Sequence, residues 1–317
     1  MHKKILIVDK VHPVLCETLT QKGFVCETKL SIDHDMFISL EDCYTGLIIR
    51  NKIIVDEAAI SSKKKLKFIL RIGSGLENID VDFAEKQGII CLRTPEGNAP
   101  AVAEHCLGLL FCALKNIPNL NDEIKKGIWI RNNQGSELSS KTVGIIGFGH
   151  TGKAFASLLK GMNCKILVYD KFYTNFSVPY IEEVSLEKLF QQADVISIHI
   201  NYMEENHHFI NKDFIDKIKK PVILINTSRG QVVSTEAVLY GLKENKITYA
   251  CLDVLEYENI HLTIPEMTEW EEPLHALAAS TQTILTPHIA GITHQSEQKH
   301  AEIALNKILS VTQYNFR

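Results

Sequence analysis

One stretch of the sequence decides the fold: Thr142-Val143-Gly144-Ile145-Ile146-Gly147-Phe148-Gly149-His150-Thr151-Gly152. It joins an apolar run, typical of a buried strand, to the pattern Gly-x-Gly-x-x-Gly, and a helix-like run follows from Lys153 to Lys160. A strand, a glycine turn and a helix in this order are typical of a dinucleotide-binding unit, in which the helix N-terminus faces the phosphates. We therefore expect the turn residues to bind the cofactor: Gly147, Phe148, Gly149, His150, Thr151 and Gly152.

An acidic residue after the next apolar run selects the cofactor. The run Lys165–Tyr169 ends on Asp170. A carboxylate at this place accepts hydrogen bonds from the adenosine ribose hydroxyls and repels a 2′-phosphate. The sequence therefore predicts NAD as the cofactor rather than NADP.

Length and composition predict an ordinary globular protein of about two domains. The chain has 317 residues, of which 45% are hydrophobic and 23% charged, and its formal net charge is -4. This balance gives no reason to expect nucleic-acid or membrane binding. The basic run at 63–67 is expected to be a solvated helix end rather than a phosphate-binding patch.

The cysteines and the N-terminus favour a cytoplasmic protein. The eight cysteines form no Cys-x-x-Cys pair and most lie in apolar stretches, as buried reduced thiols do. The chain enters a strand at Ile5–Asp9, so we expect no signal peptide. His207 and His208 stand in a polar stretch with no partner pattern, and we expect no metal site.

Strand-like and helix-like runs alternate along the chain in the manner of parallel sheets. The first set fills about ninety residues, and a second set begins at Val143. The helical run Ser296–Val311 is too short for a domain and is expected to return to the first set. We predict an α/β fold of two parallel-sheet lobes: a Rossmann NAD-binding domain (98–288) inserted into a flavodoxin-like substrate domain (1–97 and 289–317). The cleft between such lobes is the default ligand site.

Three polar residues follow successive strands of the second set. Arg229 stands in a turn after Val222–Ile225, Glu258 follows the strand that ends near Asp253, and His288 follows Thr283–Leu285. Hydride transfer needs a cation for the substrate, an acid/base, and a group that controls the acid/base. Each residue alone also fits an ordinary role: a surface arginine, a solvated glutamate or a structural histidine.

Several longer motifs, taken together, indicate a protein family. It resembles the NAD-dependent D-isomer-specific 2-hydroxyacid dehydrogenases over nearly its whole length. The matching segments are Arg71–Asp80, Asn98–His105, Gly144–Gly152, Asn226–Gly230, Leu252–Val254 and Thr286–Gly291.

The resemblance implies a role for each of the three polar residues. Arg229 binds the carboxylate and carbonyl oxygen of a 2-oxo acid, and His288 donates the proton to that carbonyl oxygen during reduction. Glu258, rather than Glu256, bonds the other imidazole nitrogen of His288 and fixes the ring. Formate dehydrogenases of this fold carry Gln at the Glu258 position, which argues against formate as the substrate.

Further contacts are implied in the same way. Asp253 contacts the nicotinamide amide, Thr227 lies alongside the cofactor, and the main-chain N–H groups of Ser74 and Gly75 receive the substrate carboxylate. One loop departs from the pattern, because His199–Met203 lacks the proline and threonine usual in the family. The cofactor contacts of that loop are left open.

Substrate choice depends on weaker signals. Arg50 matches a position where phosphoglycerate dehydrogenases hold an arginine, and Gly291 stands where D-lactate enzymes tend to place an aromatic residue. We expect 3-phosphoglycerate or glycerate/hydroxypyruvate rather than lactate, and no appended regulatory domain.

Two further expectations follow from the resemblance. The alternative to an enzyme is an NAD(H)-sensing binding protein of the same fold, because corepressors related to these enzymes keep the same three residues. The run Ala99–Lys115 and the stretch Asn116–Arg131 resemble the segment through which family members form homodimers, although an ordinary interlobe helix fits the first run equally well.

Overall fold

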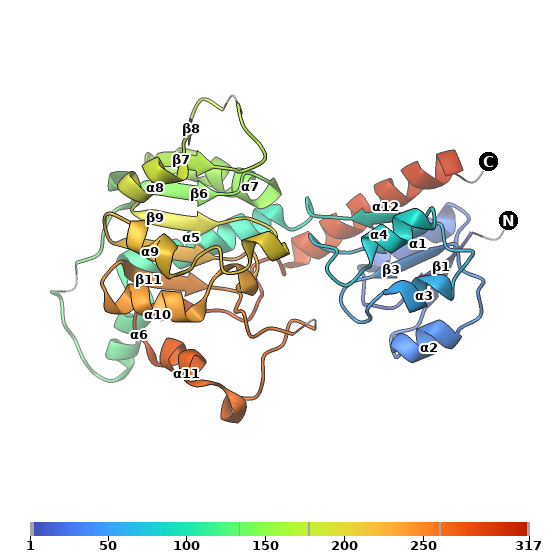
Figure 1. Ribbon diagram of the computed structural model, residues 1–317, viewed down its shortest axis with the longest axis horizontal. Coiled ribbons are helices and arrows are strands. Elements are labelled where there is room, and N and C mark those ends of the chain that lie inside the picture. Colours follow the sequence, from blue (N-terminus) through green and yellow to red (C-terminus); the bar gives the residue numbers. More distant parts are fainter. Residues whose placement is uncertain (1–2, 133, 177, 260, 316–317) are drawn as a thin grey trace. The chain divides into compact units, whose positions relative to one another are not determined.

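The computed structural model describes residues 3–132, 134–176, 178–259 and 261–315 (Figure 1). The chain forms two compact units. Unit 1 comprises the described residues of Met1–Asn98, Ile260–Leu262 and Ile292–Arg317, and unit 2 those of Ala99–Asn259 and Thr263–Gly291. The domain borders predicted from the sequence fall after residues 97 and 288, with 260–262 in the NAD-binding domain.

Unit 1 is built on a five-stranded parallel sheet in the order β2-β1-β3-β4-β5. Its strands are short apolar runs, and side chains from both faces of the sheet enter buried clusters. This burial on two faces is what a parallel sheet requires. The strands are β1 (Lys4–Ile7), β2 (Val25–Thr28), β3 (Gly46–Ile49), β4 (Phe68–Arg71) and β5 (Ile90–Arg93).

Helices cover both faces of this sheet. Asp33, Asp56 and Asp80 each accept a hydrogen bond from a first-turn N–H group and so cap three of the helices. The C-terminal helix belongs to unit 1, and its apolar side chains share a buried cluster with those of β1 and the first helix. The helices are α1 (Pro13–Gln21), α2 (His34–Ser39), α3 (Glu57–Ser61), α4 (Val81–Lys86) and α12 (His294–Asn315).

Unit 2 holds a seven-stranded parallel sheet in the order β12-β11-β10-β9-β6-β7-β8. The stretch Thr142–Gly152 supplies β6, an inner strand of this sheet between β9 and β7. The connection from β6 to β7 and then the jump to β9 on the other side of β6 is the doubly wound pattern expected of a nucleotide-binding unit. The strands are β6 (Thr142–Ile146), β7 (Lys165–Tyr169), β8 (Glu182–Glu183), β9 (Val195–Ile198), β10 (Val222–Asn226), β11 (Ile247–Leu252) and β12 (Thr283–Leu285).

Two apolar clusters, one on each face, hold the helices of unit 2 to its sheet. The helices are α5 (Ala99–Lys115), α6 (Ile117–Lys125), α7 (His150–Leu159), α8 (Leu186–Gln192), α9 (Lys212–Lys217), α10 (Thr235–Lys243) and α11 (Glu272–Ala279). Short 3-10 turns lie at Leu138–Ser140, Lys160–Met162, Glu204–Asn206, Gly230–Val232 and Met267–Glu269. The predicted α/β fold of two parallel sheets is confirmed.

The expectation for the basic run at 63–67 is wrong at its first residue. Lys63 is only 1% exposed, and its ammonium donates to the carbonyl oxygens of Ile38 and Leu40 and to the Ser62 hydroxyl. Burial lowers the pKa of Lys63. The two carbonyl partners lie at the C-terminal end of α2, more than twenty residues away, so the local pattern of charges could not reveal them. Among the described helices, none combines the length and hydropathy needed to cross a bilayer.

Candidate active site

Three neighbouring strands of unit 2 end at the same level. Asn226 of β10 pairs with Leu252 of β11, and Leu252 pairs with Leu285 of β12. Because the strands are parallel, the residues that follow them emerge at one edge of the sheet. Arg229, Asp253 and His288 all lie within three residues of these strand ends.

His288 and Glu258 form a close pair. The Nδ1 atom of His288 lies 2.5 Å from Oε2 of Glu258, and the two side chains are 21% and 10% exposed. The second carboxylate oxygen accepts a hydrogen bond from the Leu255 N–H at 2.7 Å. Nδ1–H therefore donates to the carboxylate, and Nε2, for which the described residues offer no partner, is left for an external proton donor or acceptor.

Asp253 holds the turn that carries His288. Its carboxylate is 1% exposed and accepts hydrogen bonds from the N–H groups of Ile289 and Ala290 (3.0 and 2.9 Å) and from the Thr286 hydroxyl (2.5 Å). Its main-chain carbonyl accepts the His288 N–H at 2.7 Å. His288 has a positive φ of 53°, which costs free energy outside glycine, so these bonds are needed to keep the turn in place.

Helix α5 adds two contacts that the sequence analysis did not identify. Nε2 of His105 lies 3.0 Å from the Thr286 hydroxyl, and Sγ of Cys106 lies 3.1 Å from the Thr227 hydroxyl. Burial raises the pKa of the Cys106 thiol to about 12, so it is a neutral packing group. The only sequence signal near these two contacts was the family-like segment Asn98–His105, and no function was assigned to its residues.

The Arg229 turn packs against the segment that carries Glu258. A Cβ atom on Gly230 would lie 2.0 Å from the Leu255 carbonyl oxygen, so only glycine fits there. Asn226 donates through Nδ2 to the Arg229 carbonyl at 2.9 Å and fixes the turn from the strand end. Two of the sequence-predicted residues therefore stand on adjoining backbone segments.

A second histidine–glutamate pair lies beside the first. Nε2 of His208 is 2.5 Å from Oε2 of Glu256, and the other Glu256 oxygen accepts the Thr235 N–H at 2.6 Å. The His208 N–H in turn donates to the Gln231 carbonyl at 2.9 Å. Local sequence could not reveal this partner of His208, because it is 48 residues away. Within the described residues no acidic, histidine or cysteine cluster could hold a metal ion.

The glycine turn has the geometry that its spacing predicted. Gly147 adopts φ +96°, and an added Cβ would lie 2.6 Å from the His199 carbonyl oxygen. A Cβ on Gly152 would lie 2.1 Å from the Gly147 carbonyl oxygen, so close helix–strand packing requires glycine. A Cβ on Gly149 would meet nothing within 4 Å, so this glycine is not demanded by the protein's own packing. It fits a residue whose backbone a ligand approaches.

The donors around this turn fit a dinucleotide. The N–H groups of His150, Thr151 and Gly152, in the first turn of α7, have no hydrogen-bond partner among the described residues, and no side chain caps the helix. Such a terminus is suited to a pyrophosphate. Asp170 accepts the Phe148 N–H at 2.6 Å, which joins the acid to the turn. Its other oxygen accepts the N–H groups of the next loop, so the carboxylate is fixed in place.

The loop His199–Met203, which departs from the family pattern, is held by side-chain hydrogen bonds. His199 is 7% exposed and contacts the Thr151 hydroxyl through Nδ1 (3.2 Å) and the Ser197 hydroxyl through Nε2 (2.9 Å). Asn206 accepts the Met203 N–H and donates to the Asn201 carbonyl. The loop is thus anchored without the missing proline and threonine.

The predicted substrate residues of unit 1 follow β3 and β4. The Ser74 hydroxyl donates to Oδ1 of Asn98 at 3.1 Å, and the Arg50 N–H donates to Oδ2 of Asp9 at 2.6 Å. The charge of Arg50 also acts on His300, whose pKa is lowered to about 4 chiefly by burial.

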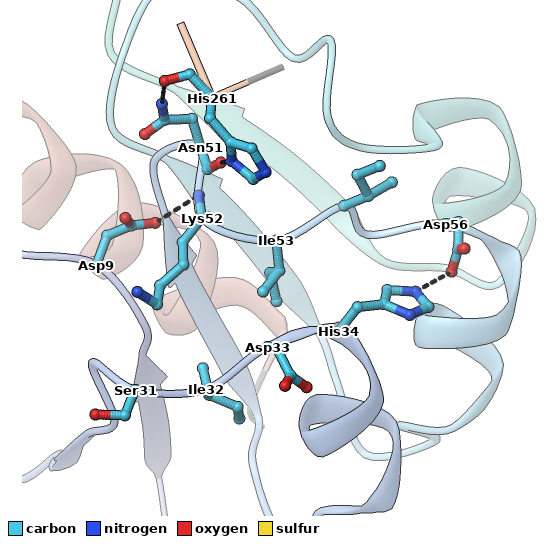
Figure 2. A pocket seen from close by; sticks show the side chains of 11 residues that line it. Asp9, Ser31, Ile32, Asp33, His34, Asn51, Lys52, Ile53, Asp56 and His261 are labelled. Atoms are coloured by element: carbon cyan, nitrogen blue, oxygen red, sulfur yellow. Dashed lines mark hydrogen bonds and ion pairs between the residues drawn. The ribbon is translucent and has the colours of Figure 1, made fainter. Parts of the chain in front are cut away.

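A cavity of about 850 Å³ lies at the carboxyl edge of the same sheet, lined in part by the loop Asn51–Ile54 (Figure 2). Figure 2 shows Asn51 and His261 joined above it by two hydrogen bonds of 3.2 Å, and His34 paired with Asp56 at 3.1 Å on its other side. Asp9 and Lys52 also line it. Three aspartates and one lysine line the cavity, so acidic groups outnumber basic ones in its charged lining.

The fold and the site define a class: an α/β protein with an NAD-type glycine turn, a fixed ribose acid, and a histidine–glutamate pair at the same edge of one sheet. Comparison with known proteins gives the family. The model for the NAD binding domain of D-isomer specific 2-hydroxyacid dehydrogenases matches residues 107–290. The chain belongs to this family.

Named relatives and a solved structure agree with this assignment. The chain is 35% identical over 297 residues to hydroxypyruvate reductase of Thermotoga maritima, covering 93% of this chain and 94% of that one. It is 29% identical over 311 residues to D-3-phosphoglycerate dehydrogenase of Archaeoglobus fulgidus, covering 97% of this chain and 57% of that one. The Aquifex aeolicus D-lactate dehydrogenase, solved with NAD and lactic acid, superposes with a TM-score of 0.82 at 25% identity, covering 99% and 96% of the two chains. The chain spans a little over half the length of the phosphoglycerate dehydrogenases it matches.

Proposed function

We propose that the protein is an NAD-dependent oxidoreductase that interconverts a D-2-hydroxy acid and its 2-oxo acid. The observation that carries the proposal is the 2.5 Å contact between His288 and Glu258 at the edge of the sheet that holds the glycine turn. An imidazole with one nitrogen fixed by a carboxylate and the other nitrogen open is suited to general acid/base catalysis. Membership of the D-isomer specific 2-hydroxyacid dehydrogenase family supports a 2-hydroxy acid and its 2-oxo acid as the reacting pair.

NAD, when bound, supplies or accepts the hydride at substrate C2. The protein's own residues do the rest of the work. In reduction, Nε2 of His288 donates its proton to the carbonyl oxygen, and the Glu258 carboxylate holds the ring through Nδ1. Arg229 binds the carboxylate and the carbonyl oxygen, a task suited to a planar guanidinium with several donors. In oxidation His288 takes the proton back.

Cofactor binding is assigned to the turn and its neighbours. The first-turn N–H groups of α7 receive the pyrophosphate, and Asp170 accepts the ribose hydroxyls, which favours NAD over NADP. Thr227 and Asp253 border the nicotinamide end. Because the Asp253 carboxylate already accepts three hydrogen bonds, its main contribution in this proposal is to hold the His288 turn.

The division of labour follows the two compact units. Unit 2 binds NAD, as the family match within it supports, and unit 1 supplies substrate contacts from Arg50, Ser74 and Gly75. Arg50, a cation that follows β3, and Gly291, which stands where D-lactate enzymes tend to place an aromatic residue, favour a 2-oxo acid with a polar or anionic tail, such as hydroxypyruvate or its 3-phosphate, rather than pyruvate. Relatives named hydroxypyruvate reductase, glyoxylate reductase and D-3-phosphoglycerate dehydrogenase are consistent with this class.

A homodimer and a cytoplasmic location complete the proposal. Five large apolar side chains are exposed along α6 and the residues after it: Ile117, Ile124, Ile128, Trp129 and Ile130. Trp129 alone is 78% exposed, and such a series is typical of a surface covered by a partner. The eight free cysteines suit a reducing compartment.

The test is a screen of NADH oxidation against glyoxylate, pyruvate, hydroxypyruvate and 3-phosphohydroxypyruvate. Turnover fastest with one of the last two supports both the reaction and the substrate class. Turnover fastest with pyruvate supports the reaction and overturns the substrate class. NADH binding without turnover on any acid would favour an NAD(H)-sensing protein and overturn the enzyme assignment.

A further inference from the structure

The loop Gly73–Leu76 after β4 is held by hydrogen bonds to each of its first three carbonyl groups. The Thr94 N–H donates to the Gly73 carbonyl at 2.9 Å. Arg93 donates through NH1 to the Ser74 carbonyl at 3.0 Å, and Arg71 donates through NH1 to the Gly75 carbonyl at 2.9 Å. Two guanidinium groups and one main-chain amide therefore fix three successive peptide planes.

The other side of these peptides is left open. In a planar trans peptide the carbonyl and the following N–H point in opposite directions. Fixing the three carbonyls therefore turns the N–H groups of Ser74, Gly75 and Leu76 away from Arg93 and Arg71. Throughout the described residues none of these three N–H groups has a hydrogen-bond partner, although Gly75 is buried. Ser74 and Leu76 are half-buried. A main-chain donor in a buried residue such as Gly75 is costly to leave without a partner, which is what a donor kept for a ligand would show.

The charges nearby favour an anion. Arg71 is 11% exposed and also donates through Nε to the Arg50 carbonyl at 3.0 Å, so its fork spans two loops. Its charge is offset by Glu77, whose carboxylate lies 3.4 Å away. Arg93 has no acidic partner among the described residues, so of the two guanidinium charges at this loop one is not offset by a carboxylate. A hydrogen bond from a cation to a peptide carbonyl also polarises the N–H of that peptide.

We propose that Arg71 and Arg93 are positioning residues that prepare the N–H groups of Ser74, Gly75 and Leu76 to bind the substrate carboxylate. This inference rests on the proposed function and adds to it two residues that do not themselves touch the substrate, and a third donor, Leu76. The two arginines differ in kind. Arg71 is a fork, 11% exposed, that needs the guanidinium shape, whereas Arg93 is an exposed single donor that another cation can replace.

The test replaces Arg93 by Met and by Lys in the full-length protein. Arg93→Met removes the donor and the charge, and we expect the KM for the 2-oxo acid to rise about 5- to 20-fold, with kcat and the Kd for NADH changed by less than about twofold. Arg93→Lys keeps a charged donor and should restore most of the KM. Lys86→Gln removes one exposed charge from α4 of the same unit and serves as the control.

A second substrate separates positioning from general damage. The amide of the same 2-oxo acid lacks the carboxylate charge, so Arg93→Met should change its kcat/KM much less than that of the acid. Equal losses for acid and amide, or a KM for the acid within about twofold of the wild type, would overturn the inference. Arg71→Lys should raise the KM as well, because one ammonium cannot span the Arg50 and Gly75 carbonyls. Absence of turnover in the wild-type protein would instead count against the proposed function.

Discussion

Replacing Glu258 by Gln tests the catalytic pair with the least change in shape. The carboxylate accepts two hydrogen bonds, from His288 Nδ1 at 2.5 Å and from the Leu255 N–H at 2.7 Å. An amide has only one oxygen, so the substituted side chain must present its NH2 group either to the ring or to the main-chain donor. The variant therefore loses the charge beside the imidazole and also leaves one donor facing another.

The magnitude follows from these two contacts. A hydrogen bond to a charged partner is worth about 1.5–3 kcal/mol. If that stabilisation is present when the ring carries its proton and is lost in the variant, kcat falls roughly 10- to 150-fold. We expect the Kd for NADH to stay within about twofold, because Glu258 contacts neither the glycine turn nor Asp170 in the described structure.

The assay is steady-state NADH oxidation with the preferred 2-oxo acid at saturation, compared with deuterated NADH so that a slow chemical step is recognised. Glu256→Gln is the matched control. It removes a carboxylate charge only two residues from Glu258, but the Glu256 carboxylate pairs with His208 and not with His288. The control should lose much less kcat. A kcat for Glu258→Gln within about twofold of the wild type, in a folded protein, would refute the reasoning.

The remaining predictions concern the ring, the turn, the pH dependence and the assembly. His288→Ala should lower kcat/KM by about 10²- to 10⁴-fold while NADH still binds, measured by turnover and by fluorescence titration. Gly149→Ala should fold normally and weaken NADH binding, whereas Gly152→Ala, whose Cβ would lie 2.1 Å from a carbonyl oxygen, should also lower the Tm; equal Tm values would contradict the packing argument. Burial lowers the pKa of His300 to about 4, below its ordinary value of 6.5, so the unfolded chain binds a proton that the folded one does not, and stability is lost as pH falls from about 6.5 towards 4 by up to ~1.4 kcal/mol per pH unit. The Tm of His300→Gln should accordingly depend less on pH in this window, and an identical slope would argue against it. Trp129→Glu should shift the protein from dimer to monomer in sedimentation velocity, and a wild-type monomer would remove the dimer proposal.

Local sequence patterns predicted those parts of the structure that depend on interactions between residues close together in the chain. The turn from Gly147 to Gly152 could be predicted because backbone sterics act over a few residues, and the structure shows the positive φ and the close carbonyl oxygen that demand glycine. The alternation of apolar runs and helices likewise predicted both parallel sheets. The choice of Glu258 over Glu256 came from the family spacing, and the structure places Glu258 against His288.

Contacts between distant segments could not be predicted in this way. Lys63 looked like a solvated charge because its partners, the carbonyls of Ile38 and Leu40, carry no sequence signal at all. Main-chain carbonyls are likewise what Arg71 and Arg93 bind, so their support of the Gly73–Leu76 loop is invisible in a pattern of side chains. The burial of Asp253 beneath the His288 turn depends on the register of β11 and β12, which the sequence does not specify.

The central claim is tested most directly by identifying the product of a reaction run with purified protein, NADH and hydroxypyruvate. We expect that glycerate forms in equal amount to the NADH consumed, that it is the D-isomer, and that His288→Ala abolishes most of it. Formation of the L-isomer, or NADH binding with no glycerate formed from this or any other 2-oxo acid in the screen, would contradict the account.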